Sequence, residues 1–318
     1  MRSDRSSTRC SIASSRQSDV LRRLILAAAD SPQLRHFVDR YGMRLGAGRF
    51  VGGETLDQVV LTLRRLNEEE LRTNTSLLGE HVADRQAADG VTATYQDVLR
   101  RIDDEKLRTN ISVKPSHLGV VIDEELGYAN IERLVAEAAR LGNFVRIDME
   151  DSSLVDVTLR IYRRLREAGH ENVGTVLQAY LYRTPDDLES LLTLRPNLRI
   201  VKGAYKESPS VAFPKKTDVD AAYDRLVERC AAEAAFTAVA THDERRIEHA
   251  LALGVGPDRM ELQMLYGVRT QLQLDLAHHG RRVLVATPFG PDWYPYLMRR
   301  LAERPANLLF FLRSALET

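Results

Sequence analysis

Residues 128–148, YANIERLVAEAARLGNFVRID, contain the unit from which the fold can be read. Apolar residues recur at helical spacing from Tyr128 to Leu141, which predicts an amphipathic helix. The short run from Asn143 to Asp148 then predicts a strand that ends on a carboxylate. A helix followed at once by a strand is the repeating element of parallel α/β folds.

The same alternation extends along the chain in both directions. A second amphipathic segment runs from Val155 to Ala168. The candidate strands are the apolar or β-branched runs Thr73–Leu78, Asn110–Lys114, Asn143–Asp148, Asn172–Gln178, Leu198–Val201, Phe236–Ala240, Arg259–Gln263 and Arg282–Ala286. Eight strand-and-helix units over roughly 250 residues match an α/β fold of the closed (β/α)8, TIM-barrel type. An open doubly wound sheet is the competing architecture.

Three regions of the chain are expected. Residues 1–18 are rich in Ser and Arg and lack the apolar run of a secretory signal, so we interpret them as a disordered tail rather than a mitochondrial targeting segment. Residues 19–70 show helical periodicity and should form N-terminal helices. Between these helices, 46–53 (GAGRFVGG) is expected to be a flexible turn, since no strand leads into its glycines as a dinucleotide site requires. Residues 71–318 would form the barrel.

The composition excludes several classes of protein. Lys+Arg and Asp+Glu are both 45, so no overall field would draw the chain to nucleic acid or an anionic membrane. The two cysteines, Cys10 and Cys230, cannot build a disulfide framework and fit a reducing, cytoplasmic setting. No apolar stretch reaches the ~20 residues of a membrane helix, so any contact with the inner membrane would be peripheral. No metal-binding, nucleophile-elbow or Walker motif occurs, and we expect no catalytic metal.

Seven of the eight candidate strands carry a polar residue at or just beyond their carboxyl end. These polar residues are Glu80, Lys114, Asp148, Gln178, Lys202, the triplet Thr241-His242-Asp243, and Gln263. Since catalytic groups of a parallel barrel come from the carboxyl ends of its strands, these residues predict one shared polar site. A later helix adds Tyr296, Arg299 and Arg300, and two adjacent guanidiniums could clamp a carboxylate or phosphate. A solvated basic stripe remains the alternative for that helix.

Six segments, in this order, resemble the signature segments of bacterial monofunctional proline dehydrogenases. They are NFVRIDMED (143–151), VLQAYLYRT (176–184), LRIVKGAY (198–205), ATHD (240–243), ELQMLYG (261–267) and YLMRRL (296–301). The resemblance covers most of the chain from about residue 50 and implies a distorted (β/α)8 barrel with non-covalent FAD. It implies oxidation of L-proline to 1-pyrroline-5-carboxylate in proline catabolism, by hydride transfer to the flavin. The implied electron acceptor is a quinone or another acceptor, met at the membrane surface.

The resemblance also implies roles for individual residues. Asp148 and Arg199 would be catalytic, with Arg199 near the flavin N5, and Glu80 would close the site as a gate. The matches to the substrate pocket are Lys114, Tyr205, Leu265, Ala286, Tyr296, Arg299 and Arg300. The matches to the flavin site are Met149, Gln178, Arg199, Val201, Lys202, Gly203, Ala204, Thr241, His242 and Gln263.

One position departs from the family pattern, because Ala286 stands where relatives usually carry a tyrosine against the substrate ring. Either a neighbouring side chain fills the space, or the pocket admits hydroxyproline or another substituted or larger cyclic amino acid. Two other functions stay open from the residues alone. One is a barrel lyase with Lys114 as a Schiff-base lysine, and the other is a catalytically silent homologue that binds an amino acid or flavin.

Overall fold

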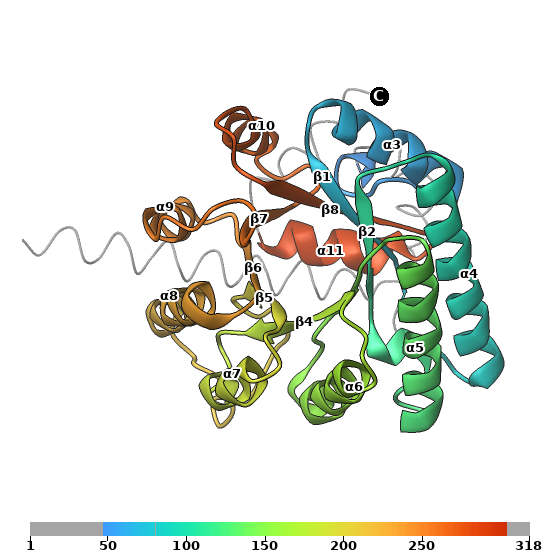
Figure 1. Cartoon of the computed structure of the whole chain (residues 1–318), viewed down its shortest axis with the longest axis horizontal. Helices are drawn as coiled ribbons and strands as arrows, with labels where there is room; N and C mark the ends of the chain where they lie inside the picture. The colour runs from blue at the N-terminus through green and yellow to red at the C-terminus, as the bar shows by residue number, and fades with distance from the viewer. Residues whose placement is uncertain (1–46, 80, 304–318) are drawn as a thin grey trace, which may run out of the picture.

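The computed structural model describes residues 47–79 and 81–303, without the side chains of residues 299–303. Within this part of the chain, eight parallel strands close into a barrel in sequence order (Figure 1). The strands are β1 Arg72–Leu77, β2 Thr109–Val113, β3 Val145–Ile147, β4 Val173–Gln178, β5 Asn197–Val201, β6 Phe236–Ala240, β7 Met260–Leu265 and β8 Val283–Phe289. The predicted TIM-type barrel is confirmed, and the open doubly wound sheet is excluded.

The last two strands run further than the sequence predicts. β7 continues to Leu265 and β8 to Phe289. β8 is long because it pairs with β1 from Arg72↔Leu284 to Leu77↔Phe289, which closes the barrel. The predicted end of the seventh strand at Gln263 is therefore wrong: Gln263 lies inside β7, two residues before its end, and its side chain is buried.

Helices lie outside the ring of strands, as crossover connections in a parallel sheet require (Figure 1). They include the two amphipathic helices that the sequence predicts at 128–141 and 155–168. The helices between strands are α4 Arg85–Asp104, α5 Glu124–Arg140, α6 Val155–Glu167, α7 Thr184–Leu192, α8 Lys216–Glu233, α9 Glu244–Ala252 and α10 Thr270–His278. The described part also contains three short 3₁₀ turns, η1 Ala47–Arg49, η2 Pro115–Leu118 and η3 Ser152–Leu154.

Helix α3 (Leu56–Glu68) packs on β1 and β8, at the seam where the barrel closes. Thr55 caps the helix: its hydroxyl accepts from the Gln58 amide, while the Gln58 side chain accepts from the Thr55 amide. The helix buries Val59, Val60 and Leu63. Of the predicted N-terminal region, residues 1–46 lie outside the described part of the chain.

The glycine-rich segment before α3 is ordered where the structure describes it, so the expectation of a flexible turn is wrong there. Phe50 and Val51 are buried, and the amide of Gly52 donates to the carbonyl of Pro288 at 2.8 Å. The amide of Gly290 donates to the carbonyl of Gly53 at 3.0 Å. Gly267 has φ +70°, and a Cβ there would lie 1.7 Å from the Arg49 carbonyl oxygen. The segment is thus pinned to the carboxyl ends of β7 and β8.

Helix α11 (Trp293–Glu303) begins shortly after β8 ends, so it starts at the carboxyl face of the barrel. Figure 1 draws it across the ring of strands, whereas the other helices lie outside. The buried Trp293 anchors its start, because its indole N–H donates to Glu54 at 2.8 Å. This placement departs from a regular (β/α)8 barrel, in which the helices surround the strands. Among the described helices, none has the length and apolarity needed to cross a bilayer.

Tyr95 of α4 ties the first two strands together from outside the barrel. Its side chain is fully buried, and its hydroxyl accepts from the partly buried Leu77 amide and donates to the buried Ser112 carbonyl, both at 3.0 Å. Burial, the largest effect, raises the pKa of Tyr95 well above its usual value, so the hydroxyl keeps its proton.

We predict that Tyr95→Phe lowers the free energy of unfolding by about 1–3 kcal/mol, because a partly buried amide and a buried carbonyl lose their shared partner. Denaturant unfolding followed by circular dichroism measures the loss. The matched control is Tyr182→Phe, whose hydroxyl bonds the Pro209 carbonyl in an exposed setting. Equal losses in the two variants would contradict the role given to burial.

Candidate active site

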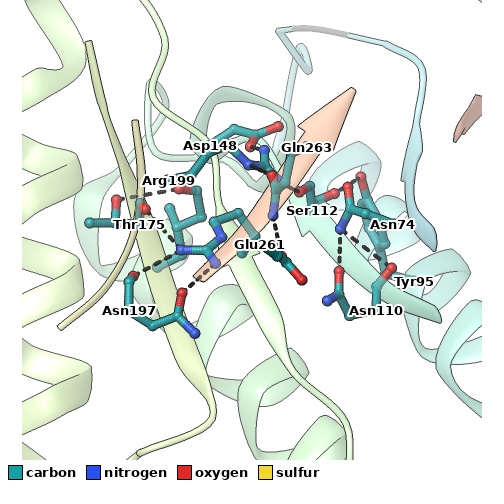
Figure 2. A network of polar contacts seen from close by, with 12 residues as sticks. Asn74, Tyr95, Asn110, Ser112, Asp148, Thr175, Asn197, Arg199, Glu261 and Gln263 are labelled. Carbon is teal, nitrogen blue, oxygen red and sulfur yellow. Dashed lines mark hydrogen bonds and ion pairs between the residues drawn. The ribbon is translucent and has the colours of Figure 1, made fainter. Parts of the chain in front are cut away.

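The interior of this barrel is ionic. Inward positions of TIM barrels are usually filled by branched apolar side chains. Here β3 contributes Arg146 and, just beyond its end, Asp148; β5 contributes Arg199; and β7 contributes Glu261 and Gln263 (Figure 2). Their apolar neighbours on the same strands, such as Ile147 and Leu262, are buried against the helices. Because side chains alternate along each strand, the apolar ones face the helices and form an outer core. The inward-facing polar residues Arg146, Asp148, Arg199, Glu261 and Gln263 are called the polar axis.

Arg199 lies at the centre of the polar network. Its Nη1 donates to Asp148 Oδ1 at 2.7 Å, its Nε to Gln263 Oε1 at 2.5 Å, and its Nη2 to Ser112 Oγ at 3.1 Å (Figure 2). These partners come from three other strands or strand ends. Because a guanidinium carries five N–H donors, two remain for a ligand after these three bonds. The side chain is 11% exposed and that of Asp148 is 25% exposed, so the ion pair faces the barrel mouth.

Arg146 is buried closer to the amino ends of the strands. Its Nη1 donates to the carbonyls of Thr175 and Asn197, and its Nη2 to Asn197 Oδ1 at 2.5 Å. Gly174 makes room for it, since a Cβ there would lie 2.4 Å from Nη1. Burial first, and the charge of Arg199 second, lower the pKa of Arg146 to about 9. It remains a cation at neutral pH, so the barrel interior holds two guanidiniums.

Glu150 organises the loop that follows Lys114. Its carboxylate accepts from the Ser116 amide at 2.8 Å and the Ser116 hydroxyl at 2.6 Å, while its own carbonyl accepts from Gln178 Nε2 at 2.7 Å. All three residues are almost fully buried. This arrangement fixes Gln178 and the turn after β2 relative to the end of β3. Lys114 is half-buried, and its Nζ lies 3.4 Å from the Gly79 carbonyl.

Lys202, just beyond β5, belongs to a separate ionic group. Its ammonium pairs with Asp220 of α8 and, at 2.8 Å, with Asp243. Lys216 pairs with the same two carboxylates. Burial alone would raise the pKa of Asp243, but the hydrogen bond and charge of Lys202, with the charges of Lys216 and Arg246, lower it to about 2. A hollow of about 390 Å³ borders this group and is lined by Lys216, Asp220, Asp243 and Arg246, among others.

Two residues after β6 are fixed by hydrogen bonds from the backbone. His242 Nε2 accepts from the Leu265 amide at 2.9 Å. The hydroxyl oxygen of Thr241 accepts from the Asp243 amide at 3.1 Å, which leaves its own hydrogen free to donate. The His242 carbonyl accepts from Arg269 at 2.8 Å, which fixes the turn.

The structure brings several predicted residues together and leaves others untested. Asp148, Arg199 and Gln263 are in direct contact, and Leu265 and Ala286 are paired in register on β7 and β8. Most of the remaining described candidates lie at or near the carboxyl ends of strands: Met149 and Thr241 are buried, Val201, Gly203 and Tyr205 are half-buried, and Ala204 is exposed. Tyr296 lies in α11 and is half-buried. Glu80 and the side chains of Arg299 and Arg300 lie outside the described residues, so their roles stay predictions.

Sequence reasoning missed Glu261, Arg146 and Glu150, although all three are 3% exposed or less. Glu261 and Arg146 could have been found as charged residues in the middle of otherwise apolar strands, since such residues are rarely buried without partners. Within the described residues, no group of three or more His, Cys, Asp or Glu side chains could hold a metal ion.

The fold and the ionic carboxyl mouth define a TIM-barrel enzyme whose site suits a charged ligand. Comparison with known proteins identifies the family. The profile of the family described as "Proline dehydrogenase" matches residues 59–313. Proline dehydrogenase 1 of Bacillus subtilis (strain 168) is 39% identical over 302 residues, which is 94% of this chain and 100% of that protein. Proline dehydrogenase of Deinococcus radiodurans is 42% identical over 304 residues, 93% of this chain and 98% of that one. The chain therefore belongs to the proline dehydrogenase family.

A solved structure supports the fold independently. Proline utilization A from Bdellovibrio bacteriovorus, inactivated by N-propargylglycine, superposes with a TM-score of 0.77 at 21% identity. The match covers 85% of this chain but only 34% of that protein, so the chain spans about one third of its length. At this identity, the likeness confirms the barrel and nothing more.

We predict that Asp243 stabilises the fold only at pH values at which its carboxyl group is ionised. Its folded pKa of about 2 lies below the ordinary value of 3.8, so its contribution is complete above about pH 5 and is lost as the pH falls toward 2. Asp243→Asn should therefore be less stable than the wild type at pH 6.5, with a smaller difference at pH 3.

Urea unfolding at the two pH values measures this difference. The same substitution at the exposed Asp97, which pairs with Arg100 on the outside of α4, is the control and should show little effect at either pH. A stability difference for Asp243→Asn that is unchanged between pH 6.5 and pH 3 would contradict the assignment.

Proposed function

We propose that this protein is an FAD-dependent proline dehydrogenase that oxidises L-proline to 1-pyrroline-5-carboxylate. The observation that carries the proposal is the match, at about 40% identity, to proline dehydrogenases over more than nine tenths of both chains. The ionic cluster of Asp148, Arg199 and Gln263 supports it from the site itself, because it places a fixed cation and a carboxylate at the barrel mouth. Such an oxidoreductase acts on the CH–NH group of its donor.

The residues at the carboxyl mouth fit FAD by the chemistry of their donors. A flavin with its pyrophosphate presents many hydrogen-bond acceptors and negative charge. Arg199 keeps two N–H groups, and Thr241 keeps its hydroxyl hydrogen. Gly203 adds an open stretch of backbone with φ +118°, where a Cβ would lie 2.3 Å from the ring of Tyr180. When bound, FAD would accept the hydride.

We propose that the other members of the predicted flavin set contribute according to their positions. Met149 and Gln178 are buried at the ends of β3 and β4, so they would shape the floor of the site. Val201, Lys202, Gly203 and Ala204 follow one another at the end of β5, where Lys202 supplies a positive charge. Because Asp220 and Asp243 already neutralise Lys202, its ammonium would hold a phosphate only as part of a larger network.

The substrate would be held by groups of opposite charge. Lys114, with Arg299 and Arg300, would bind the substrate carboxylate, and Tyr205, Leu265 and Tyr296 would line the pocket around the ring. Lys114 and Asp148 follow neighbouring strands, and the amide of Asp148 donates to the Val113 carbonyl at 2.9 Å, which fixes the spacing of the two strand ends. A ring clamped by its carboxylate has one orientation for hydride transfer. A cationic site also favours the neutral substrate amine, so no dedicated strong base is needed.

The proposed partners follow the family resemblance. Electrons would leave the flavin for a quinone or a similar acceptor, and a protein in the cytoplasm would meet it at the inner-membrane surface. Glu80 would close the site as a gate. An assay with a membrane quinone in place of a soluble dye tests the acceptor directly.

We predict that the purified protein with FAD oxidises L-proline when given an artificial electron acceptor, and that Arg199→Lys lowers kcat/KM about 100-fold. Lysine keeps the charge but cannot reach Asp148, Gln263 and Ser112 together, and losing charge-assisted bonds worth about 3 kcal/mol corresponds to that factor. The product is measured as the pyrroline. The control is Arg229→Lys, at a surface ion pair with Glu189. No turnover of proline by the wild type would contradict the proposal.

A broader substrate range is a second candidate, favoured by the surroundings of Ala286. In β8 it is the one residue that is not buried, and it pairs in register with Leu265 and Asn74. Its side chain is much smaller than the tyrosine usual at this position in the family, so a tyrosine here would take up room beside the substrate ring. We therefore propose that the pocket admits trans-4-hydroxyproline or a similar substituted ring beside proline.

We predict that Ala286→Tyr lowers kcat/KM for trans-4-hydroxyproline about tenfold relative to proline, since filling a pocket by a few atoms discriminates on that scale. Steady-state kinetics with both substrates, for wild type and variant, measures the ratio. Ala286→Ser is the control, because it barely changes the volume. Strong selectivity for proline in the wild type, unaltered by the tyrosine, would rule out the broader range.

A further inference from the structure

Glu261 is a buried carboxylate to which neither the sequence motifs nor the proposed reaction gives a role. It lies on β7 and is 3% exposed. Its Oε1 accepts from Gln263 Nε2 at 2.5 Å (Figure 2). Its Oε2 accepts from Arg282 Nε at 2.8 Å. Burying a carboxylate costs several kcal/mol unless it is paired and hydrogen-bonded, so both contacts are needed.

The chemistry of the neighbours fixes the orientation of the Gln263 amide. A guanidinium can only donate, and an ionised carboxylate can only accept. Gln263 must therefore present its oxygen to Arg199 Nε, at 2.5 Å, and its nitrogen to Glu261. Because Glu261 can only accept, this is the only orientation of the Gln263 amide in which both of its groups have a hydrogen-bond partner. Without the charge, the amide could rotate and turn its nitrogen toward Arg199.

The chain of contacts crosses the barrel from one end to the other. It begins at Arg282, which is stacked on Phe236 at the amino-terminal end, beside a hollow of about 480 Å³. It passes through Glu261 and Gln263 to Arg199 and ends at Asp148 near the carboxyl mouth. Glu261 lines the hollow at the far end from the proposed substrate, so it would act through its neighbours rather than by touching the substrate.

The charge of Glu261 also balances the barrel interior. Arg146 and Arg199 repel each other there, and this repulsion lowers the pKa of Arg146, whereas Glu261 raises it. Arg282 alone could have been satisfied by solvent, because its side chain is 28% exposed. Pairing with Arg282 therefore does not explain why Glu261 is buried. Its hydrogen bond with Gln263 and its charge interaction with Arg146 do.

We propose that Glu261 is a positioning residue for the proposed proline oxidation. Through Gln263 it holds Arg199 in the orientation in which the guanidinium pairs with Asp148 and would bind the flavin. The inference rests on the proposed function. It assigns to β7 a role that neither the fold nor the pairing with Arg282 requires.

The direct test is Glu261→Gln, which keeps the shape of the side chain and removes its charge. We expect the limiting rate of flavin reduction by L-proline to fall about tenfold, the scale of one charge-assisted hydrogen bond. The dissociation constants of proline and FAD should stay within about twofold. Stopped-flow reduction and titration calorimetry measure these quantities. The control is Glu189→Gln, which removes the same charge from the exposed ion pair with Arg229 and should leave the rate unchanged.

The route through Gln263 is tested by a double-mutant cycle with Gln263→Leu. If Glu261 acts through Gln263, the double variant should reduce its flavin no more slowly than the slower single variant. Independent, multiplying effects would overturn the route. An unchanged rate in Glu261→Gln would overturn the proposal, as would a rate loss explained entirely by weaker binding of proline or FAD.

A milder variant keeps the proposal testable if Glu261→Gln does not fold. Glu261→Asp retains the charge but shortens the reach, so the reduction rate should fall at least threefold and the midpoint potential of bound FAD should become more negative as the guanidinium is drawn away. A potential and rate equal to those of the wild type would overturn the proposal. Failure of the wild type itself to be reduced by proline would instead contradict the proposed function.

Discussion

The ion pair between Arg199 and Asp148 is the constraint around which the barrel is built. A guanidinium inside a ring of strands has little water to solvate it, so the protein must supply charge and acceptors from several directions. Asp148, Gln263 and Ser112 do so from three other strands or strand ends. Each of these partners is then held by further contacts, such as those of Glu261 to Gln263 and of Tyr95 to the Ser112 carbonyl. Fixing one cation thus fixes the relative positions of β2, β3, β5 and β7.

This architecture suits redox chemistry on a charged small molecule. A preorganised guanidinium stabilises developing negative charge without having to reorient, and a clamped substrate reacts from one pose. Residues such as Ile147 and Leu262 belong to the apolar core between the strands and the helices. Helix α11 and the ordered segment before α3 are both placed at the carboxyl face, where a ligand would need to be shielded from water.

Much of the fold could be predicted from sequence, because strands and helices in an α/β barrel have distinct hydrophobic periods. The eight strands and the helices α5 and α6 follow directly from that pattern. The end of β7 and the described residues 47–53 were misjudged, since strand length depends on barrel closure and the order of a glycine-rich link depends on contacts with β8. The sequence singled out Asp148 and Arg199, which the structure brings into contact, but it did not single out Glu261. Its role depends on which side chains meet across the barrel, and spacing along one strand does not encode this.

The central claim is that the polar residues inside the barrel would hold FAD beside an amino-acid substrate, which donates a hydride to it. The measurement that tests it most directly is the visible spectrum of the FAD-loaded protein before and after anaerobic addition of L-proline. The account predicts flavin bands near ~375 and ~450 nm, with the ~450 nm band bleaching as the hydride arrives. A protein that takes up no FAD, or whose flavin bands stay unchanged with proline, would contradict it.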